Sequence, residues 1–319
     1  MHAASLIMLS WAMIGAACVV SPASTGLVAG LLAILVAVIG LPHGAADHRF
    51  ARPRLEPIFG PAWMAAFLTG YLLIAAVVVL GWSLAPAATV VVFFLASAWH
   101  FGQEEPSFAV GPRSLRAVFL FARGGLVIWV PTVFQPAEVL RILSIAAPPA
   151  FAADIRQAAI AVGIFAWPLL IVAAVGWVWQ CCRACSATGR TRRVLLIDNC
   201  LTASLAAVFA TASPLVSFLI YFCGWHSVRG LHRLRREHGE SWSQLAVSLA
   251  PMTLAAIVLI AMASGAALRA PTLGETLIRA TFVGLSAMAI PHILLHLSGH
   301  FFDHHQGPRT AALELGSSA

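Results

Sequence analysis

Five histidines stand near the ends of apolar segments, in a chain where charged residues make up only 10%. They occur in the strings GLPHGAADH, SAWHFGQEE, FCGWHSVRG and AIPHILLH, as His43, His100, His226, His292 and His296. Neutral imidazole is the commonest metal ligand, and histidines on separate helices can converge on one ion inside a bundle. A lone histidine at a helix end more often caps carbonyl groups. Several histidines in this position favour a metal site.

Two carboxylates follow two of these histidines at a spacing of four residues. Asp47 follows His43, and Glu104 follows His100. On a continuous helix each pair would lie side by side, and a metal-bound imidazole usually donates its second N–H to such an acceptor. Solvation of both carboxylates at the membrane interface is the alternative. Ligation by nitrogen alone suits iron, copper or zinc.

The elements that must position these residues are membrane helices. The chain is 60% hydrophobic with a mean hydropathy of +0.89, whereas soluble domains carry about 25% charged residues. Apolar runs of about 20 residues recur along it, the length that crosses a bilayer. We expect an all-α, polytopic transmembrane helical bundle of about 8–10 segments. Residues 1–298 would form one integral membrane domain, and 299–319 a cytoplasmic tail containing histidines.

The apolar runs divide into ten expected segments. Their ranges are 4–20, 24–42, 62–82, 86–102, 115–133, 158–179, 195–211, 214–227, 243–264 and 273–298. The first run has no preceding Lys or Arg, so we expect a retained span rather than a cleaved signal. The stretch 195–227 is too long for one span and contains Pro214. We therefore expect this stretch to be split or re-entrant.

The arginines orient these segments. All 19 basic residues are arginine. With ten segments and both termini on one side, fourteen arginines fall on that side and three on the other, with two inside spans. The positive-inside rule makes the arginine-rich side cytoplasmic, which predicts a multi-pass inner-membrane protein with both termini in the cytoplasm. The five histidines then share the cytoplasmic ends of different helices.

The motifs GLPHGAADH, SAWHFGQEE and YFCGWHSVR, with a late PH, resemble the Brp/Blh family of bacterial β-carotene 15,15'-dioxygenases. The resemblance spans residues 40 to about 300. It implies an Fe(2+) site held by histidines and O2-dependent cleavage of the central double bond of β-carotene into two retinals. By motif, His43, His100 and His226 correspond to iron ligands.

One position departs from the family pattern, which has a second histidine four residues after the one at 226. This chain has Gly230 there, and the next histidine is His232. Six residues correspond to about 240° around a regular helix, so His232 would face away from His226 unless the helix is distorted. His292 or His296 are the other candidates for the fourth ligand, and three histidines with water would also suffice.

Aromatic residues flank the histidines and are candidates for an apolar substrate tunnel. They are Phe93, Phe94, Trp99, Phe101, Tyr221, Phe222 and Trp225. The substrate would be a polyene dissolved in the bilayer, so few acid–base groups are needed when the metal does the electronic work. Core packing or an interfacial aromatic belt would explain the same residues.

Two other classes of function are compatible with parts of the pattern. His292, His296, His300 and His304 are spaced by four and followed by His305, which loosely resembles the histidine boxes of membrane di-iron hydroxylases and desaturases. A non-enzymatic metal or carotenoid binder is the second alternative. An opsin-type retinal carrier is excluded, because its Schiff base needs a lysine and this chain has none. A metal transporter would carry ionisable residues in the middle of the membrane, and Arg123 is the clear candidate for such a residue.

The remaining signals exclude functions rather than suggest them. No P-loop, GxGxxG context or Ser–His–acid pattern is present, so we expect no nucleotide cofactor. The arginines lie in loops between spans, which predicts no nucleic-acid partner. Cys181, Cys182 and Cys185 form a single cluster without a partner pair, which favours reduced structural thiols.

Overall fold

The computed structural model describes residues 25–104, 115–266 and 270–305, and every regular element within these ranges is helical. The elements are α2 (Thr25–Leu35), η2 (Val36–Gly40), α3 (Leu41–Ala45), α4 (Asp47–Phe59), η3 (Gly60–Ala62), α5 (Trp63–Leu84), α6 (Pro86–Gln103), α7 (Arg116–Gly124), α8 (Leu126–Phe134), α9 (Pro136–Ala146), η5 (Pro149–Phe151), α10 (Ala152–Ser186), α11 (Gly189–Thr211), α12 (Pro214–Leu219), η6 (Ile220–Ser227), α13 (Val228–Glu237), α14 (Trp242–Ala266) and α15 (Leu273–His305). The expected span 4–20 lies outside the described residues.

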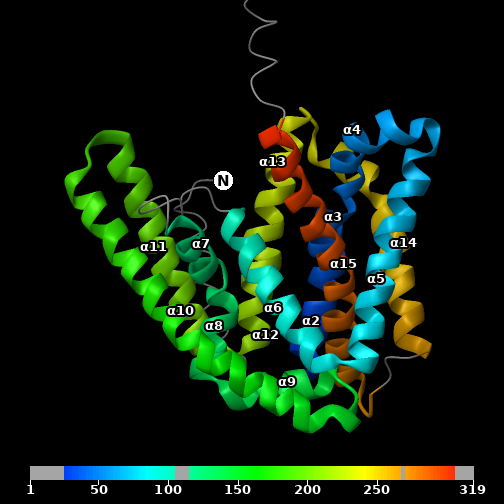
Figure 1. Cartoon of the computed structure of the whole chain (residues 1–319), viewed down its shortest axis with the longest axis horizontal. Helices are drawn as coiled ribbons and strands as arrows, with labels where there is room; N and C mark the ends of the chain where they lie inside the picture. Colours follow the sequence, from blue (N-terminus) through cyan, green and yellow to red (C-terminus); the bar gives the residue numbers. More distant parts are fainter. Residues whose placement is uncertain (1–24, 105–114, 267–269, 306–319) are drawn as a thin grey trace, which may run out of the picture.

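The prediction of an all-α membrane bundle is confirmed. Within the described part of the chain, five helical runs are long and apolar enough to cross a membrane, and the bent pair α7–α8 makes a possible sixth. The first run, Gly26–Leu84, is 59 residues long. In Figure 1 it passes up through α2 and α3, turns at α4 and returns through α5. The run Gly26–Leu84 therefore contains two antiparallel passes through the bundle.

Figure 1 separates two ends of the bundle. The elements α4 and α13 lie at the upper end of the view, and α9 lies across the lower end. The long helix α15 connects the two ends and contacts α2, α5, α6, α9 and α14 along the way. It also contacts α3, so it touches the elements that carry His43 and His100.

The predicted break in 195–227 is present. Helix α11 ends at Thr211 and α12 begins at Pro214. Proline has no N–H to continue the α11 ladder, and its fixed φ suits the first turn of a new helix. The Ser213 hydroxyl caps that turn by accepting a hydrogen bond from the Val216 N–H at 3.5 Å.

Two π-helical segments lie at the histidine motifs. The segment η2 ends at Gly40, just before Pro42 and His43, and η6 contains His226. Pro42 lacks a donor for the helical ladder, which favours a local change of hydrogen-bonding pattern. A π-helical turn takes up extra residues and rotates the side chains that follow, a change often found at functional sites.

The backbones of α6 and α7 are in close contact at the end of α6 that carries His100. A Cβ on Gly102 would overlap the backbone of Leu120, and one on Gly124 would overlap the backbone of Ala98 and Gly102. Only glycine permits this approach, as at many contacts between membrane helices. The last turn of α6, which holds His100, is therefore fixed against its neighbour.

Candidate metal centre

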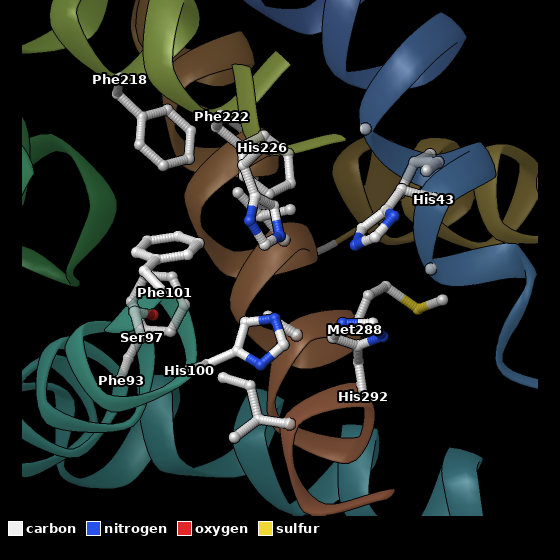
Figure 2. Close-up of a pocket in the computed structure, with 16 residues that line it drawn as sticks. His43, Phe93, Ser97, His100, Phe101, Phe218, Phe222, His226, Met288 and His292 are labelled. Atoms are coloured by element: carbon white, nitrogen blue, oxygen red, sulfur yellow. The ribbon is translucent and has the colours of Figure 1, made fainter. Parts of the chain in front are cut away.

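Four histidines from four helical elements form a closed circuit of imidazole rings. The ring centroids are 5.0 Å apart for His43–His226, 5.4 Å for His226–His100, 4.9 Å for His100–His292 and 5.2 Å for His292–His43. Figure 2 shows the four rings pointing toward one centre from different ribbons. These elements meet near the end of the bundle that carries α4 and α13.

The spacing and the hydrogen bonding of these rings fit a metal ion. Metal–nitrogen bonds of about 2.0–2.1 Å place the centroids of imidazoles around one ion about 5 Å apart. Among the described residues, the buried Nε2 atoms of His43, His100 and His292 have no hydrogen-bond partner. A buried polar atom without a partner is costly, and three that converge from separate helices are explained by a shared ligand.

Two of the candidate fourth ligands have different surroundings. The His296 ring lies 4.4 Å from His292 and 5.8 Å from His100, at the edge of the circuit, and also contacts Phe50 at 4.7 Å. The His232 ring stacks on Trp242 at 6.0 Å, away from the circuit. Position 232 thus faces away, as the helical spacing predicts, and His292 is the fourth member of the circuit.

Asp47 contacts a different histidine from the one expected. The chain turns at Ala46 between α3 and α4, so His43 and Asp47 do not share one continuous helix. The buried Asp47 Oδ1 instead accepts a hydrogen bond from His292 Nδ1 at 2.7 Å. This bond fixes the tautomer of His292 and leaves its Nε2 lone pair directed elsewhere, as in many metal-bound histidines.

Tyr71 extends this contact into α5. Its hydroxyl lies 3.1 Å from Asp47 Oδ2 and 2.8 Å from the carbonyl oxygen of Met288, and either oxygen can accept a hydrogen bond from it. Ligand atoms of Asp47, His292 and His296 lie within 4.8 Å of one another, and the His296 Nε2 is 3.8 Å from Asp47 Oδ1. Because Asp47 accepts a hydrogen bond from His292 and lies within reach of the Tyr71 hydroxyl, we interpret it as the group that orients His292.

The Glu104 side chain pairs with an arginine and not with the His100 imidazole, the partner expected from the spacing. Its carboxylate forms an ion pair with the Arg233 Nη1 of α13 at 3.0 Å, while its backbone N–H donates to the His100 carbonyl. Glu104 is the residue at which α6 ends, so its side chain leaves the helix toward the arginine-rich α13. This ion pair connects α6 to α13 at the end of the bundle where the histidines lie.

The histidine circuit borders an apolar cavity, here called the histidine chamber, with an empty volume of about 570 Å³. Its lining includes the four histidines and Phe93, Phe101, Phe218, Phe222, Leu285 and Met288. The phenyl rings gather on one side of the circuit in Figure 2. Of the expected tunnel residues, Phe93, Phe101 and Phe222 line this chamber, whereas Trp99 and Trp225 do not.

Sequence reasoning missed part of the lining. Phe218 and Met288 stand eight and four residues before His226 and His292, about two turns and one turn along their helical segments. Their spacing was a usable signal, because residues four apart share a helix face. Trp225 instead contacts the guanidinium of Arg229, 4.8 Å from its ring centroid.

The other clusters of the sequence add no ligands to the circuit among the described residues. Cys181, Cys182 and Cys185 lie on α10 and are free thiols, as are Cys200 and Cys223. The backbone of α15 continues to His305, so the first residues of the expected tail are helical. The side chains of His300, His304 and His305 lie outside the described residues.

The fold and the site define a helical membrane protein with a buried cluster of histidines beside an apolar chamber. Residues 34–298 match the model of the family described as Beta-carotene 15,15'-dioxygenase, and the chain belongs to this family. The match includes all four histidines of the circuit.

Two curated proteins resemble the chain over most of its length. A Beta-carotene 15,15'-dioxygenase from uncultured marine bacterium 66A03 is 28% identical over 271 residues, covering 82% of this chain and 90% of the relative. The Probable beta-carotene 15,15'-dioxygenase Blh of Halobacterium salinarum is 27% identical over 298 residues, covering 86% and 84%. No solved structure matches the chain significantly.

Proposed function

We propose that this chain is an Fe(2+)-dependent dioxygenase that cleaves β-carotene at its central 15,15' double bond. One C=C bond breaks, each of its carbons gains one oxygen atom of O2, and two molecules of retinal result. The observation that carries the proposal is the circuit of four imidazoles with three unpartnered Nε2 atoms, placed against an apolar chamber. The family and the names of the two relatives support the substrate and the bond that is cleaved.

In this proposal His43, His100, His226 and His292 would hold the iron, which would supply the activation of O2. Asp47 orients His292 through the hydrogen bond to Nδ1. His296 stands next to this pair, with its Nε2 3.8 Å from Asp47 Oδ1, and this proposal does not include it among the iron ligands.

The chamber suits a hydrocarbon substrate. Its lining apart from the histidines is almost wholly phenyl and aliphatic, so it offers an apolar polyene a dry surface and excludes water from the oxygen chemistry. The protein then contributes position and dryness more than proton transfer. The substrate would enter from the bilayer that surrounds the bundle.

We further propose that the protein lies in the inner membrane with both termini in the cytoplasm. The support is the distribution of arginine along the sequence, with fourteen on one side and three on the other. The histidine circuit would then lie toward the cytoplasmic leaflet, near α4 and α13.

Expression in a bacterial host that makes β-carotene tests the function. We expect the orange colour to fade and retinal to accumulate, and each of His43→Ala, His100→Ala, His226→Ala and His292→Ala to stop this. His238→Ala is the matched control, because its Nδ1 hydrogen-bonds the Leu234 carbonyl at 3.0 Å, outside the circuit. Unchanged colour despite good expression and bound iron would contradict the proposal.

Iron content separates this proposal from a membrane di-iron enzyme. One iron per chain is expected, because the four imidazoles surround a single centre. Two irons per chain, both lost on replacement of His296, would favour the di-iron alternative. Bound metal without consumption of O2 or carotenoid would favour a binding protein.

A further inference from the structure

A second apolar cavity, here called the side cavity, adjoins the histidine chamber. Its empty volume is about 590 Å³, and it lies among α6, α8, α9, α12 and α15. Four residues line both cavities: Phe93, Ser97, Phe101 and Phe218. The two cavities therefore share one wall, made of these four side chains, on the side of the circuit where the phenyl rings gather in Figure 2.

The chemistry of the side cavity selects an apolar occupant. Its lining is aliphatic and aromatic apart from Ser97 and Thr132, and the Thr132 hydroxyl already donates to the Ile128 carbonyl at 2.6 Å. A polar or charged ligand would lose its hydrogen bonds to water there without replacement, whereas a hydrocarbon would lose none.

The positions of the lining residues along α15 give the distance from the histidine circuit to the far end of the side cavity. His292, Met288 and Leu285 line the histidine chamber, and Phe282 lines the side cavity. Ten residues of α-helix separate Phe282 from His292, which is about 15 Å along the axis. This distance is comparable with one ring-bearing half of a C40 carotenoid, from its central bond to the end of its ring.

The helix α9 closes the far end of the side cavity. Val139, Ile142 and Leu143 of α9 line it and are buried, and α9 lies across the end of the bundle away from α4 and α13 (Figure 1). Both ends of this helix are held in place. The Gln135 amide donates to the Ala212 carbonyl at 2.7 Å, and the Arg279 Nε donates to the Ile145 carbonyl at 2.8 Å. Because both ends of α9 are fixed, this helix can limit how far a bound molecule extends into the side cavity.

We infer that the side cavity binds one ring-bearing half of the carotenoid, and that α9 is the floor that places the central double bond at the histidine circuit. This inference rests on the proposed function. The depth of the floor makes Val139, Ile142 and Leu143 specificity-determining residues. A substrate arm that ends at α9 has one bond opposite the circuit, which gives a single cleavage position.

The test compares two substrates and three proteins in lipid nanodiscs. Val139→Phe fills the side cavity, and Leu140→Phe is the control, because Leu140 is the next residue of α9 and does not line it. The substrates are β-carotene, which has two ringed halves, and β-apo-8'-carotenal, whose second arm is short and ringless. Because overpacking a filled site is unfavourable, Val139→Phe is expected to lower kcat/KM for β-carotene about tenfold. The apocarotenal should be cleaved at nearly the wild-type rate, because it can place its short arm in the side cavity. That arm does not reach α9, so Val139→Phe does not obstruct it.

Binding without O2 gives a readout that does not depend on turnover. Under anaerobic conditions the wild type and Leu140→Phe should retain β-carotene, and Val139→Phe should bind it about tenfold more weakly. If the wild type makes no retinal from either substrate, the proposed function fails, and this binding result alone decides the inference. Equal losses for both substrates, or unchanged binding and turnover of β-carotene in Val139→Phe, would overturn it.

A second variant keeps the test decisive if Val139→Phe fails to fold. Leu143→Ala deepens the floor, so β-carotene should slide further in and yield off-centre apocarotenals beside retinal. Exclusive production of retinal at the wild-type KM by this variant would count against α9 as the floor.

Discussion

Gly230 lies directly against the imidazole of His43, so closely that a Cβ at position 230 would overlap the ring. This is the position at which the family pattern has a histidine. Because Gly230 is four residues after His226, it shares a helix face with His226 and points toward the circuit. In this chain the ring of His43 occupies the space that a side chain at 230 would need, and His292 is the fourth histidine of the circuit.

Gly230→Ala is expected to displace His43 and weaken iron binding. Overpacking of this kind costs about 1–3 kcal/mol, which corresponds to about 5- to 150-fold in affinity. The measurement is iron affinity of the purified protein, with thermal unfolding alongside. Gly70→Ala on α5 is the control, since nothing lies within 4 Å of a Cβ there. Equal iron affinity in both variants would show that the Gly230–His43 contact does not position a ligand.

The choice of fourth ligand can be tested with one pair of variants. His292→Ala should lose iron and carotenoid cleavage together, because its Nε2 faces the circuit without another partner among the described residues. His232→Ala should keep both, because that ring stacks on Trp242. Iron per chain and retinal formation are measured on the same preparations. Loss of iron in His232→Ala with retention in His292→Ala would reverse the assignment.

The sequence predicted where the site lies in the bundle better than it predicted the contacts within the site. The apolar segments and the arginine asymmetry placed His43, His100 and His226 at one end of the bundle because membrane helices have a fixed length and orientation. The partner of Asp47 depended on the turn at Ala46, which interrupts the helical register. The helix α9 was not predicted, because its 11 residues are too short to span a membrane and carry an exposed Glu138–Arg141 pair.

Asp47 and Tyr71 are expected to control how tightly iron is held. Replacing a group that orients a metal-bound histidine typically lowers metal affinity about 10–100-fold. Asp47→Asn should fall in this range, because an amide cannot accept as strongly from the His292 Nδ1. Tyr71→Phe should have a smaller effect in the same direction, since it leaves the Asp47–His292 hydrogen bond in place and removes the hydroxyl contacts to the far oxygen of Asp47 and to the Met288 carbonyl.

Glu104→Gln is the matched carboxylate control for that prediction. Glu104 pairs with Arg233, whose side chain is 46% exposed, and exposed ion pairs contribute at most about 1 kcal/mol. Iron affinity by competition with a chelator, and the spectrum of the bound metal, are measured for all three variants. A loss in Glu104→Gln as large as that in Asp47→Asn would contradict the orienting role of Asp47.

The chain also holds a buried ion pair away from the histidines, between Arg123 of α7 and Asp198 of α11. Their side chains are 10% and 8% exposed, and Nη2 lies 2.9 Å from Oδ2. Gln180 of α10 accepts from the Arg123 Nη1 at 3.1 Å and donates to Asp198 at 2.5 Å. Arg123 is thus a contact among three helices, which explains a charged residue in an apolar segment without invoking transport.

Breaking this pair should destabilise the bundle without emptying the metal centre. Asp198→Asn leaves the Arg123 charge buried without its counter-ion, which typically costs about 3–5 kcal/mol, so the thermal unfolding temperature in detergent should fall clearly. The double variant Arg123→Met, Asp198→Leu should recover much of that loss, because two apolar side chains need no counter-ion. Glu138→Gln, in the exposed pair with Arg141, is the control and should change little. Iron per folded chain should stay constant in all of them, because the pair joins α7 and α11, and the circuit histidines lie on other elements. A double variant less stable than Asp198→Asn would show that the polar contacts themselves hold α7, α10 and α11 together.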